Sequence, residues 1–228
     1  MTNAAPAYLF DAVGTLIYPE PAPADVYYAA GVRCGSRLAR EEIERGFRAA
    51  FAAEEARDAR HNGLRTDEAR EFERWRNIVA AVVHDVRGPA AERLFDELWT
   101  HFARPSVWRA FDDAAPTLAA LAARGHTVAI ASNFDRRLYA IVAELLPVVP
   151  PERVFVSSSL GFRKPAGAFF QGCRERIGLT NHPTIVVGDD VDNDLHCPRT
   201  EGLTAVLLDR RDRHPELAPR IATLTELL

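Results

Sequence analysis

Short apolar runs spaced along almost the whole chain constrain its fold most strongly. Runs of apolar and β-branched residues bounded by turn residues are typical of buried strands. Such runs lie at Ala7–Phe10, Thr127–Ala131, Arg153–Ser157, Thr184–Val187 and Thr204–Leu208. Helical patterns separate the later runs, at Asp112–Arg124, Asp135–Leu146 and Ala166–Ile177, and the first two begin with an aspartate, as capped helices do. Strands that alternate with helices predict an α/β fold with a parallel sheet and helices on both faces.

The long segment after the first run has a different pattern. From about Tyr18 to Arg104 there is no strand pattern, but there are three amphipathic helix candidates, at Arg40–Arg57, at Asp67–Val86 and from Pro89 onward. Proline-rich stretches, YPEPAPAD and RPSVW, flank this segment. We therefore expect an all-helical domain at residues 18–107, inserted into a discontinuous α/β core made of residues 1–17 and 108–228.

Composition excludes several classes of partner and compartment. The net charge is −4 over 228 residues, so there is no overall positive field that would attract nucleic acid. The three cysteines are widely spaced, which argues against a disulfide framework or a zinc site and fits a reducing cytoplasm. No signal-peptide pattern and no run near the ~20 apolar residues of a membrane helix is present. We expect a cytoplasmic protein without membrane segments, either a monomer or a homodimer.

Polar residues follow four of the predicted strands. Asp11 follows the first, Ser132 and Asn133 the second, Lys164 the third, and the acidic stretch GDDVDND the fourth. Lys164 is the only lysine among 28 lysine and arginine residues, which marks a position that requires a compact ammonium. In open parallel sheets, ligands bind beyond the carboxyl ends of the strands. Oxygen-rich acidic groups suit Mg²⁺, so the sequence predicts a cleft with a carboxylate nucleophile and a magnesium site.

These four motifs together resemble those of the haloacid dehalogenase-like (HAD) hydrolases with a helical cap inserted after the first motif. The resemblance rests on Asp11-x-x-Gly14-Thr15-Leu16, Ser132, Lys164 and GDDVDND. It implies a Rossmann-like core plus cap, with Asp11 as the nucleophile and Ser132 and Lys164 as phosphoryl-binding groups. It implies Mg²⁺ held by Asp11, Asp189, Asp194 and the backbone carbonyl of Val13, and substrate contacts from Asn133, Gly14 and Thr15. For Asp190 two roles stay open, a ligand through water or an acid outside the ligand set.

Val13 departs from the family pattern. Family phosphatases usually carry an aspartate two residues after the nucleophile, which protonates the leaving group and later activates water. Loss of a general acid typically costs ~10²–10⁴-fold in rate. We expect a Mg²⁺-dependent hydrolase that forms an aspartyl-phosphate on Asp11 from a small phosphorylated substrate. Its leaving group would need little protonation, or the acid would come from water or from the cap, where His61, His84 and His101 are candidates.

Three alternatives remain at this point. The family's dehalogenases also lack the second aspartate, but they typically have tyrosine there and need no metal, so the GDDVDND cluster argues against them. The family's phosphonate hydrolases carry a small apolar residue there, but they need a cap lysine, and Lys164 lies in the predicted core. A non-catalytic relative that binds a phosphorylated ligand or a protein partner is the third alternative.

Overall fold

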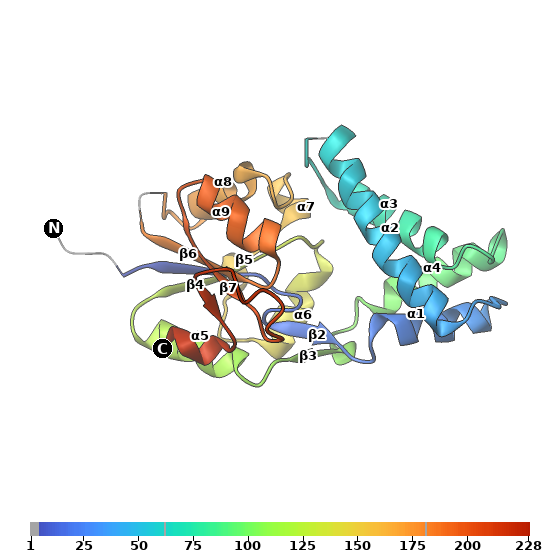
Figure 1. The fold of residues 1–228 in the computed structure, drawn as a ribbon, viewed down its shortest axis with the longest axis horizontal. Helices are drawn as coiled ribbons and strands as arrows, with labels where there is room; N and C mark the ends of the chain where they lie inside the picture. The colour runs from blue at the N-terminus through green and yellow to red at the C-terminus, as the bar shows by residue number, and fades with distance from the viewer. Residues whose placement is uncertain (1–4, 62, 181) are drawn as a thin grey trace.

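The computed structural model describes residues 5–61, 63–180 and 182–228 and has two parts, a sheet with its helices and a layer of four helices (Figure 1). The sheet is parallel, with strand order β5-β4-β1-β6-β7-β8. Its strands are β1 (Ala7–Phe10), β4 (Thr127–Ser132), β5 (Val154–Val156), β6 (Thr184–Gly188), β7 (Thr204–Leu208) and β8 (Arg220–Ile221). The α/β fold is thereby confirmed. Among the six strands of this sheet, only the two-residue β8 has no counterpart in the sequence pattern.

The central strand β1 explains why both faces of the sheet are covered. β1 pairs with β4 on one side and β6 on the other, with Ala7 opposite Thr127 and Thr184. Its alternate side chains enter two separate apolar cores, Phe10 in one and Leu9 in the other. The first core includes α5 (Ala114–Ala123) and α6 (Arg137–Leu145), and the second includes α8 (Gly167–Arg176) and α9 (Cys197–Thr200). This two-sided burial is typical of parallel sheets.

Two helices begin later than their aspartates predict. The Asp113 carboxylate beside the start of α5 pairs with Arg210 at 2.7 Å and accepts the Leu224 N–H at 2.9 Å, and α5 has no side-chain cap. Asp135 accepts the backbone N–H of Arg137 at 3.0 Å and pairs with its guanidinium. The Asp113 carboxylate is therefore engaged by Arg210 and Leu224 and does not cap α5. The helix α6 begins at Arg137, after Asp135.

The four-helix layer is attached through a short two-stranded ribbon. In this ribbon β2 (Ile17–Pro19) pairs antiparallel with β3 (Trp108–Ala110). Between these strands lie α1 (Pro23–Arg33), α2 (Arg40–His61), α3 (Glu68–Val82) and α4 (Pro89–His101), packed around an apolar core of their own. The helix α1 was not expected, because its first residues lie in a proline-rich stretch. Pro23 occupies the first turn, where a missing N–H breaks no helical hydrogen bond.

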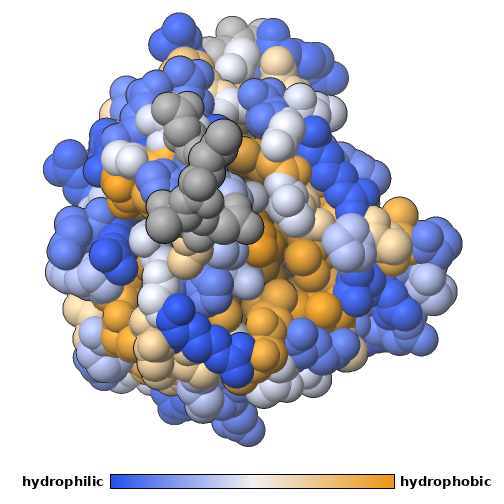
Figure 2. All heavy atoms as spheres, turned by 90° about the vertical axis from the view of Figure 1, so that its left-hand side faces the viewer, coloured by the Kyte–Doolittle hydropathy of each residue, from blue (hydrophilic) through white to orange (hydrophobic). Residues whose placement is uncertain are grey.

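The helical layer lies beyond the carboxyl ends of the strands (Figure 1). The opposite end of the core, where the strands begin, carries mixed hydrophilic and hydrophobic residues (Figure 2). Within the described residues, no helix combines the length and the apolar composition that a membrane span requires. All three cysteines are free thiols, as their spacing predicts.

Buried ion pairs fasten the tip of the helical layer to the core. Arg163 follows the short helix α7 (Ser157–Leu160) and is 3% exposed. Its guanidinium contacts Glu71 of α3 and lies 3.8 Å from Asp58 of α2. The Arg163 N–H also donates to the Leu64 carbonyl at 2.8 Å. We call this set, Arg163 with Glu71 and Asp58, the cap latch.

We predict that Glu71→Gln lowers the free energy of unfolding by about 3 kcal/mol, because removal of one partner leaves the buried Arg163 charge poorly compensated. The Glu92→Gln variant removes an exposed pair with Arg76, whose side chains are 57% and 49% exposed, and should cost less than about 1 kcal/mol. Urea denaturation of both variants tests this. Equal losses would show that the latch adds nothing beyond a surface pair.

Candidate active site

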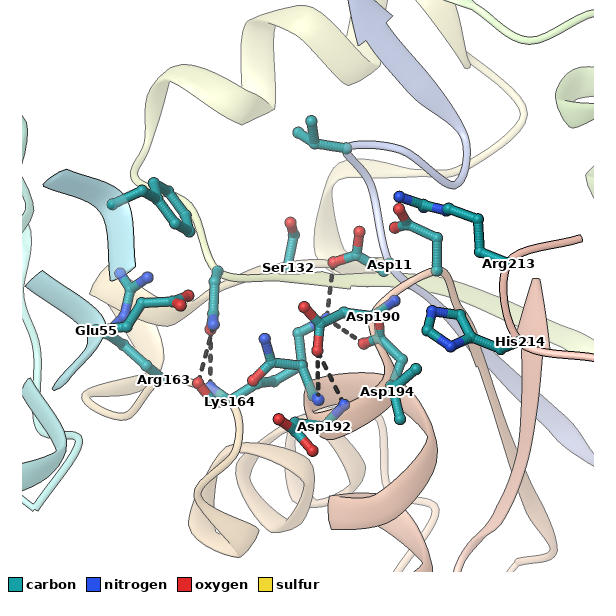
Figure 3. Close-up of a pocket in the computed structure, with 16 residues that line it drawn as sticks. Asp11, Glu55, Ser132, Arg163, Lys164, Asp190, Asp192, Asp194, Arg213 and His214 are labelled. Atoms are coloured by element: carbon teal, nitrogen blue, oxygen red, sulfur yellow. Dashed lines mark hydrogen bonds and ion pairs between the residues drawn. The ribbon is translucent and has the colours of Figure 1, made fainter. Parts of the chain in front are cut away.

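A cleft of about 550 Å³ separates the carboxyl ends of the strands from the helical layer (Figure 3). Most of the site residues predicted in the core line this cleft, namely Asp11, Val13, Ser132, Asn133, Lys164, Asp189, Asp190 and Asp194. From α2, Phe51 and Glu55 line the opposite wall. The cleft forms there because parallel strands end at the same edge of the sheet, which brings together the residues that follow β1, β4 and β6.

Lys164 joins two of the carboxylates. Its Nζ donates to Asp11 Oδ1 and to Asp194 Oδ1, each at 2.7 Å, and the residue is 3% exposed. Burial alone would lower the pKa of Lys164, but the charges of Asp11 and Asp194 outweigh it and raise the pKa above its usual value. The ammonium is therefore held as a cation beside Asp11.

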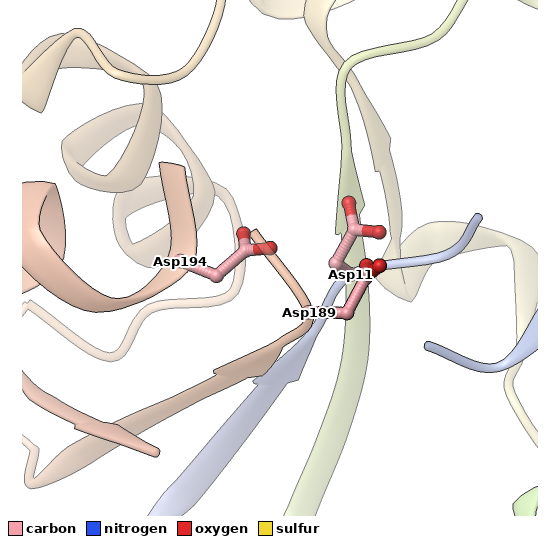
Figure 4. A group of neighbouring side chains, drawn as sticks. All are labelled: Asp11, Asp189 and Asp194. Carbon is pink, nitrogen blue, oxygen red and sulfur yellow. The ribbon is translucent and has the colours of Figure 1, made fainter. Parts of the chain in front are cut away.

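Three carboxylates meet at this point (Figure 4). Ligand oxygens of Asp11, Asp189 and Asp194 all lie within 4.8 Å of one another. Burial, followed by the nearby charge of Asp11, raises the pKa of Asp189 to about 6. Burial also raises the pKa of Asp194, with Lys164 opposing it. One ammonium does not balance three carboxylates, so this donor set of hard oxygens fits a divalent cation such as Mg²⁺.

Two glycines let the backbone approach these acids closely. Gly14 has φ 92°, and a Cβ there would lie 2.5 Å from an oxygen of Asp189. A Cβ on Gly188 would lie 2.1 Å from an oxygen of Asp194. Thr15 is fully buried and donates to Asp189 Oδ1 at 3.2 Å. Gly14 and Thr15 are not among the described residues that line the cleft, and both lie against Asp189. Their contact with substrate stays a prediction.

Asn133 and Asp190 hold other parts of the site in place. The Asn133 side chain accepts the Lys164 N–H at 2.7 Å and donates to the Lys164 carbonyl at 2.9 Å. Asp190 caps the one-turn helix η3 (Val191–His196) by accepting N–H groups of Asp192 and Asn193. Its own N–H donates to Asp194 Oδ2 at 3.2 Å. Of the two roles left open for Asp190, support outside the ligand set fits these contacts.

Ser132 and Asp11 have side-chain oxygens on the same side of the sheet edge, facing the cleft (Figure 3). Ser132 ends β4 and is 2% exposed. Val13 lies two residues after Asp11 and is 36% exposed, which places an apolar side chain on the cleft wall.

Several cleft residues were not predicted, among them Glu55, Arg163, Arg213 and His214. Burial raises the pKa of Glu55, and the Arg74 charge, 3.9 Å away, opposes that rise. The only signal for Glu55 was its position one helical turn after Phe51, on the same helix face. Among the candidate cap histidines, His84 and His101 do not line the cleft, and the His61 side chain lies outside the described structure.

Comparison with known proteins places this geometry in context. A sequence model described as haloacid dehalogenase-like hydrolase matches residues 5–196. The chain is 26% identical over 230 residues to haloacid dehalogenase-like hydrolase domain-containing protein 3 of Danio rerio, with 96% of this chain and 93% of that protein covered.

Solved structures share the whole fold. A dehalogenase superposes with a TM-score of 0.72 at 22% identity, over 100% of this chain and 97% of that one. A HAD phosphatase from Thermococcus onnurineus superposes with a TM-score of 0.66 at 23% identity, over 97% of this chain and 95% of that one. At such identities these likenesses establish the fold alone.

We predict that Asp189→Asn stabilises the metal-free protein by about 2 kcal/mol at pH 8. A carboxyl with a folded-state pKa near 6, against 3.8 when unfolded, costs stability above pH 6, and the cost disappears as the pH falls toward 4. The same change should abolish stabilisation by Mg²⁺, which in the wild type reaches about 2.7 kcal/mol at a hundredfold excess over Kd.

Thermal unfolding in EDTA and in Mg²⁺ measures both effects. Asp192→Asn is the matched control, because Asp192 lines the cleft but is outside the three-carboxylate cluster. If Asp192→Asn behaved like Asp189→Asn, general negative charge and not the cluster would be responsible.

Proposed function

The chain belongs to the haloacid dehalogenase-like hydrolases, which confirms the resemblance seen in its motifs, and we propose that it is a Mg²⁺-dependent, phosphatase-type member. Asp11 would take the phosphoryl group of a small phosphorylated molecule and pass it to water. One observation carries the proposal: Asp11 shares the buried Lys164 ammonium with Asp194 and lies in the same carboxylate cluster as Asp189. A nucleophile placed beside a fixed cation and a cation site suits phosphoryl transfer.

Each residue would have a separate role in the reaction. The Asp11 carboxylate oxygen attacks phosphorus, and the bond to the leaving oxygen breaks. Lys164 and the Ser132 hydroxyl hold phosphoryl oxygens as their charge develops. Asp11, Asp189, Asp194 and the Val13 carbonyl would hold Mg²⁺, which neutralises phosphate charge when bound. Water then attacks the aspartyl-phosphate, which releases phosphate and restores Asp11.

Val13 restricts which substrates can react. Its side chain cannot donate a proton, so we propose that the leaving oxygen departs as a comparatively stable anion. Esters of alkyl alcohols meet this condition poorly, whereas acyl and aryl phosphates meet it well. The missing general acid therefore limits the substrates to those with such leaving groups and does not abolish activity.

The dehalogenase alternative agrees with Val13, because halide needs no protonation. It gives no role to the clustered carboxylates, and the structural likeness to a dehalogenase concerns the fold. A non-catalytic binding protein would have no need for a nucleophile-grade Asp11 beside Lys164. For these reasons we favour the phosphatase.

We predict that the protein releases phosphate from acetyl phosphate, whose carboxylate leaving group needs little acid assistance. Release should require Mg²⁺ and fall at least ~10³-fold in Asp11→Asn, since that change removes the nucleophile. Phosphate release with and without EDTA measures this. A stoichiometric burst without turnover would locate the defect in hydrolysis of the aspartyl-phosphate, and no reaction in any condition would favour the binding protein.

We predict that Val13→Asp raises kcat/KM for an alkyl phosphate such as glycerol phosphate by ~10²-fold, because it restores a proton donor near the leaving oxygen. Acetyl phosphate turnover should change much less. Val13→Asn, which has the shape but not the proton, is the matched control. Equal gains in both variants would mean that polarity, not acid catalysis, limits the reaction.

A further inference from the structure

A second cavity opens from the active-site cleft into the helical layer. Its volume is about 350 Å³, and it shares Val13, Phe51 and Asn133 with the cleft. The rest of its wall is mainly aromatic and aliphatic, with Tyr27, Phe47, Trp75, Trp99, Phe102 and Trp108 as the large rings. A molecule whose phosphoryl group faces Asp11 can therefore extend past Val13 into this cavity.

The charged and amide groups on the cavity wall are already engaged. Arg137 donates to Asp135 at 2.8 and 2.7 Å and to the Trp99 carbonyl at 3.2 Å, and its guanidinium lies 3.5 Å from the centre of the Trp99 ring. The Asn133 amide is held by the Lys164 backbone. Apart from the Tyr27 hydroxyl, the side chains that remain on this wall favour an uncharged, apolar group.

Val13 connects this cavity to the reaction. Val13 and Phe51 are the apolar residues that border both spaces, so a carboxylate at position 13 would interrupt a continuous apolar wall. The same residue removes the general acid, which restricts the reaction to leaving groups that are stable as anions. Aromatic hydroxyls satisfy both conditions, because they are apolar and their anions are more stable than alkoxides.

We propose that the substrate is an aryl phosphate, whose uncharged aromatic group occupies the second cavity while its phosphoryl group faces Asp11. This inference rests on the proposed function. The bond from Asp11 to phosphorus forms as the phosphorus–aryloxide bond breaks, the aryloxide leaves with the electron pair and takes a proton from water, and hydrolysis yields phosphate. A cavity of about 150 Å³ holds one benzene ring, so the volume here accommodates two fused rings.

The cavity also contains its own spectroscopic reporter, because the three tryptophans of the chain all line it. Asp11→Asn protein with Mg²⁺ would be titrated with phenyl phosphate and with inorganic phosphate. We expect phenyl phosphate to change the tryptophan emission and to bind at least about tenfold more tightly, from burial of one ring. Inorganic phosphate should leave the emission unchanged.

Turnover gives the second arm of the test. Val79 is 4% exposed and lines the cavity, so Val79→Phe fills part of it. We expect the ratio of kcat/KM for phenyl phosphate to that for acetyl phosphate to fall about tenfold. Val32→Phe, the same change at a position of α1 that is 50% exposed, should leave the ratio unchanged.

The outcomes separate the two proposals. In the first outcome, acetyl phosphate turns over through Asp11, but phenyl phosphate and inorganic phosphate bind equally tightly and Val79→Phe leaves the kcat/KM ratio unchanged. The aryl substrate is then refuted and the proposed function stands. In the second outcome, phenyl phosphate binds with a change in tryptophan emission, but neither phenyl phosphate nor acetyl phosphate turns over. The proposed function then fails, and the aryl phosphate fails with it as a substrate.

Discussion

The pairing of one buried ammonium with two buried carboxylates organises the molecule. Burial of a charge costs several kcal/mol unless its partners compensate it. Lys164 is compensated by Asp11 at the end of β1 and Asp194 in η3, and it comes itself from the segment after α7. Three distant segments must meet for any of these charges to be stable. The arrangement that we propose binds phosphate is thus also a condition for folding the sheet edge.

The position of Lys164 depends in turn on the helical layer. Arg163, its neighbour in the chain, is the core side of the cap latch, and Asn133 holds the Lys164 backbone from β4. A displacement of α3 that broke the Arg163–Glu71 contact would act one residue away from the ammonium. The layer that covers the cleft therefore also constrains the cation inside it, and the aromatic cavity belongs to that same layer.

Much of the core was predictable, because buried parallel strands have long apolar runs and their ends converge. Asp11, Ser132, Lys164, Asp189 and Asp194 could be brought together on that ground alone. The division at residues 17 and 107 remains a prediction. The ribbon of β2 and β3 escaped detection because its strands are only three residues long and β2 ends in a proline.

Features that depend on packing were harder to predict. Glu55 looks like any other charged residue of α2, and only the fold brings it to the cleft. Many aromatic residues of the helical layer belong to its apolar core. The residues that line the second cavity come from several helices. The apolar pattern of a single helix carries no information about the space between helices. Gly14 has a positive φ of 92°, but its close approach to Asp189 is visible only in the fold.

The central place of β1 has a consequence for synthesis of the chain. β1 precedes its partners in the chain by a long interval, because β4 and β6 begin at Thr127 and Thr184. The strand β1 therefore stays without its partners until β4 and β6 have been made. The helices α1–α4 make mostly local contacts and can assemble during that interval. The inserted layer can thus fold before the sheet that contains it, and the core closes around β1 only after β6 has been made.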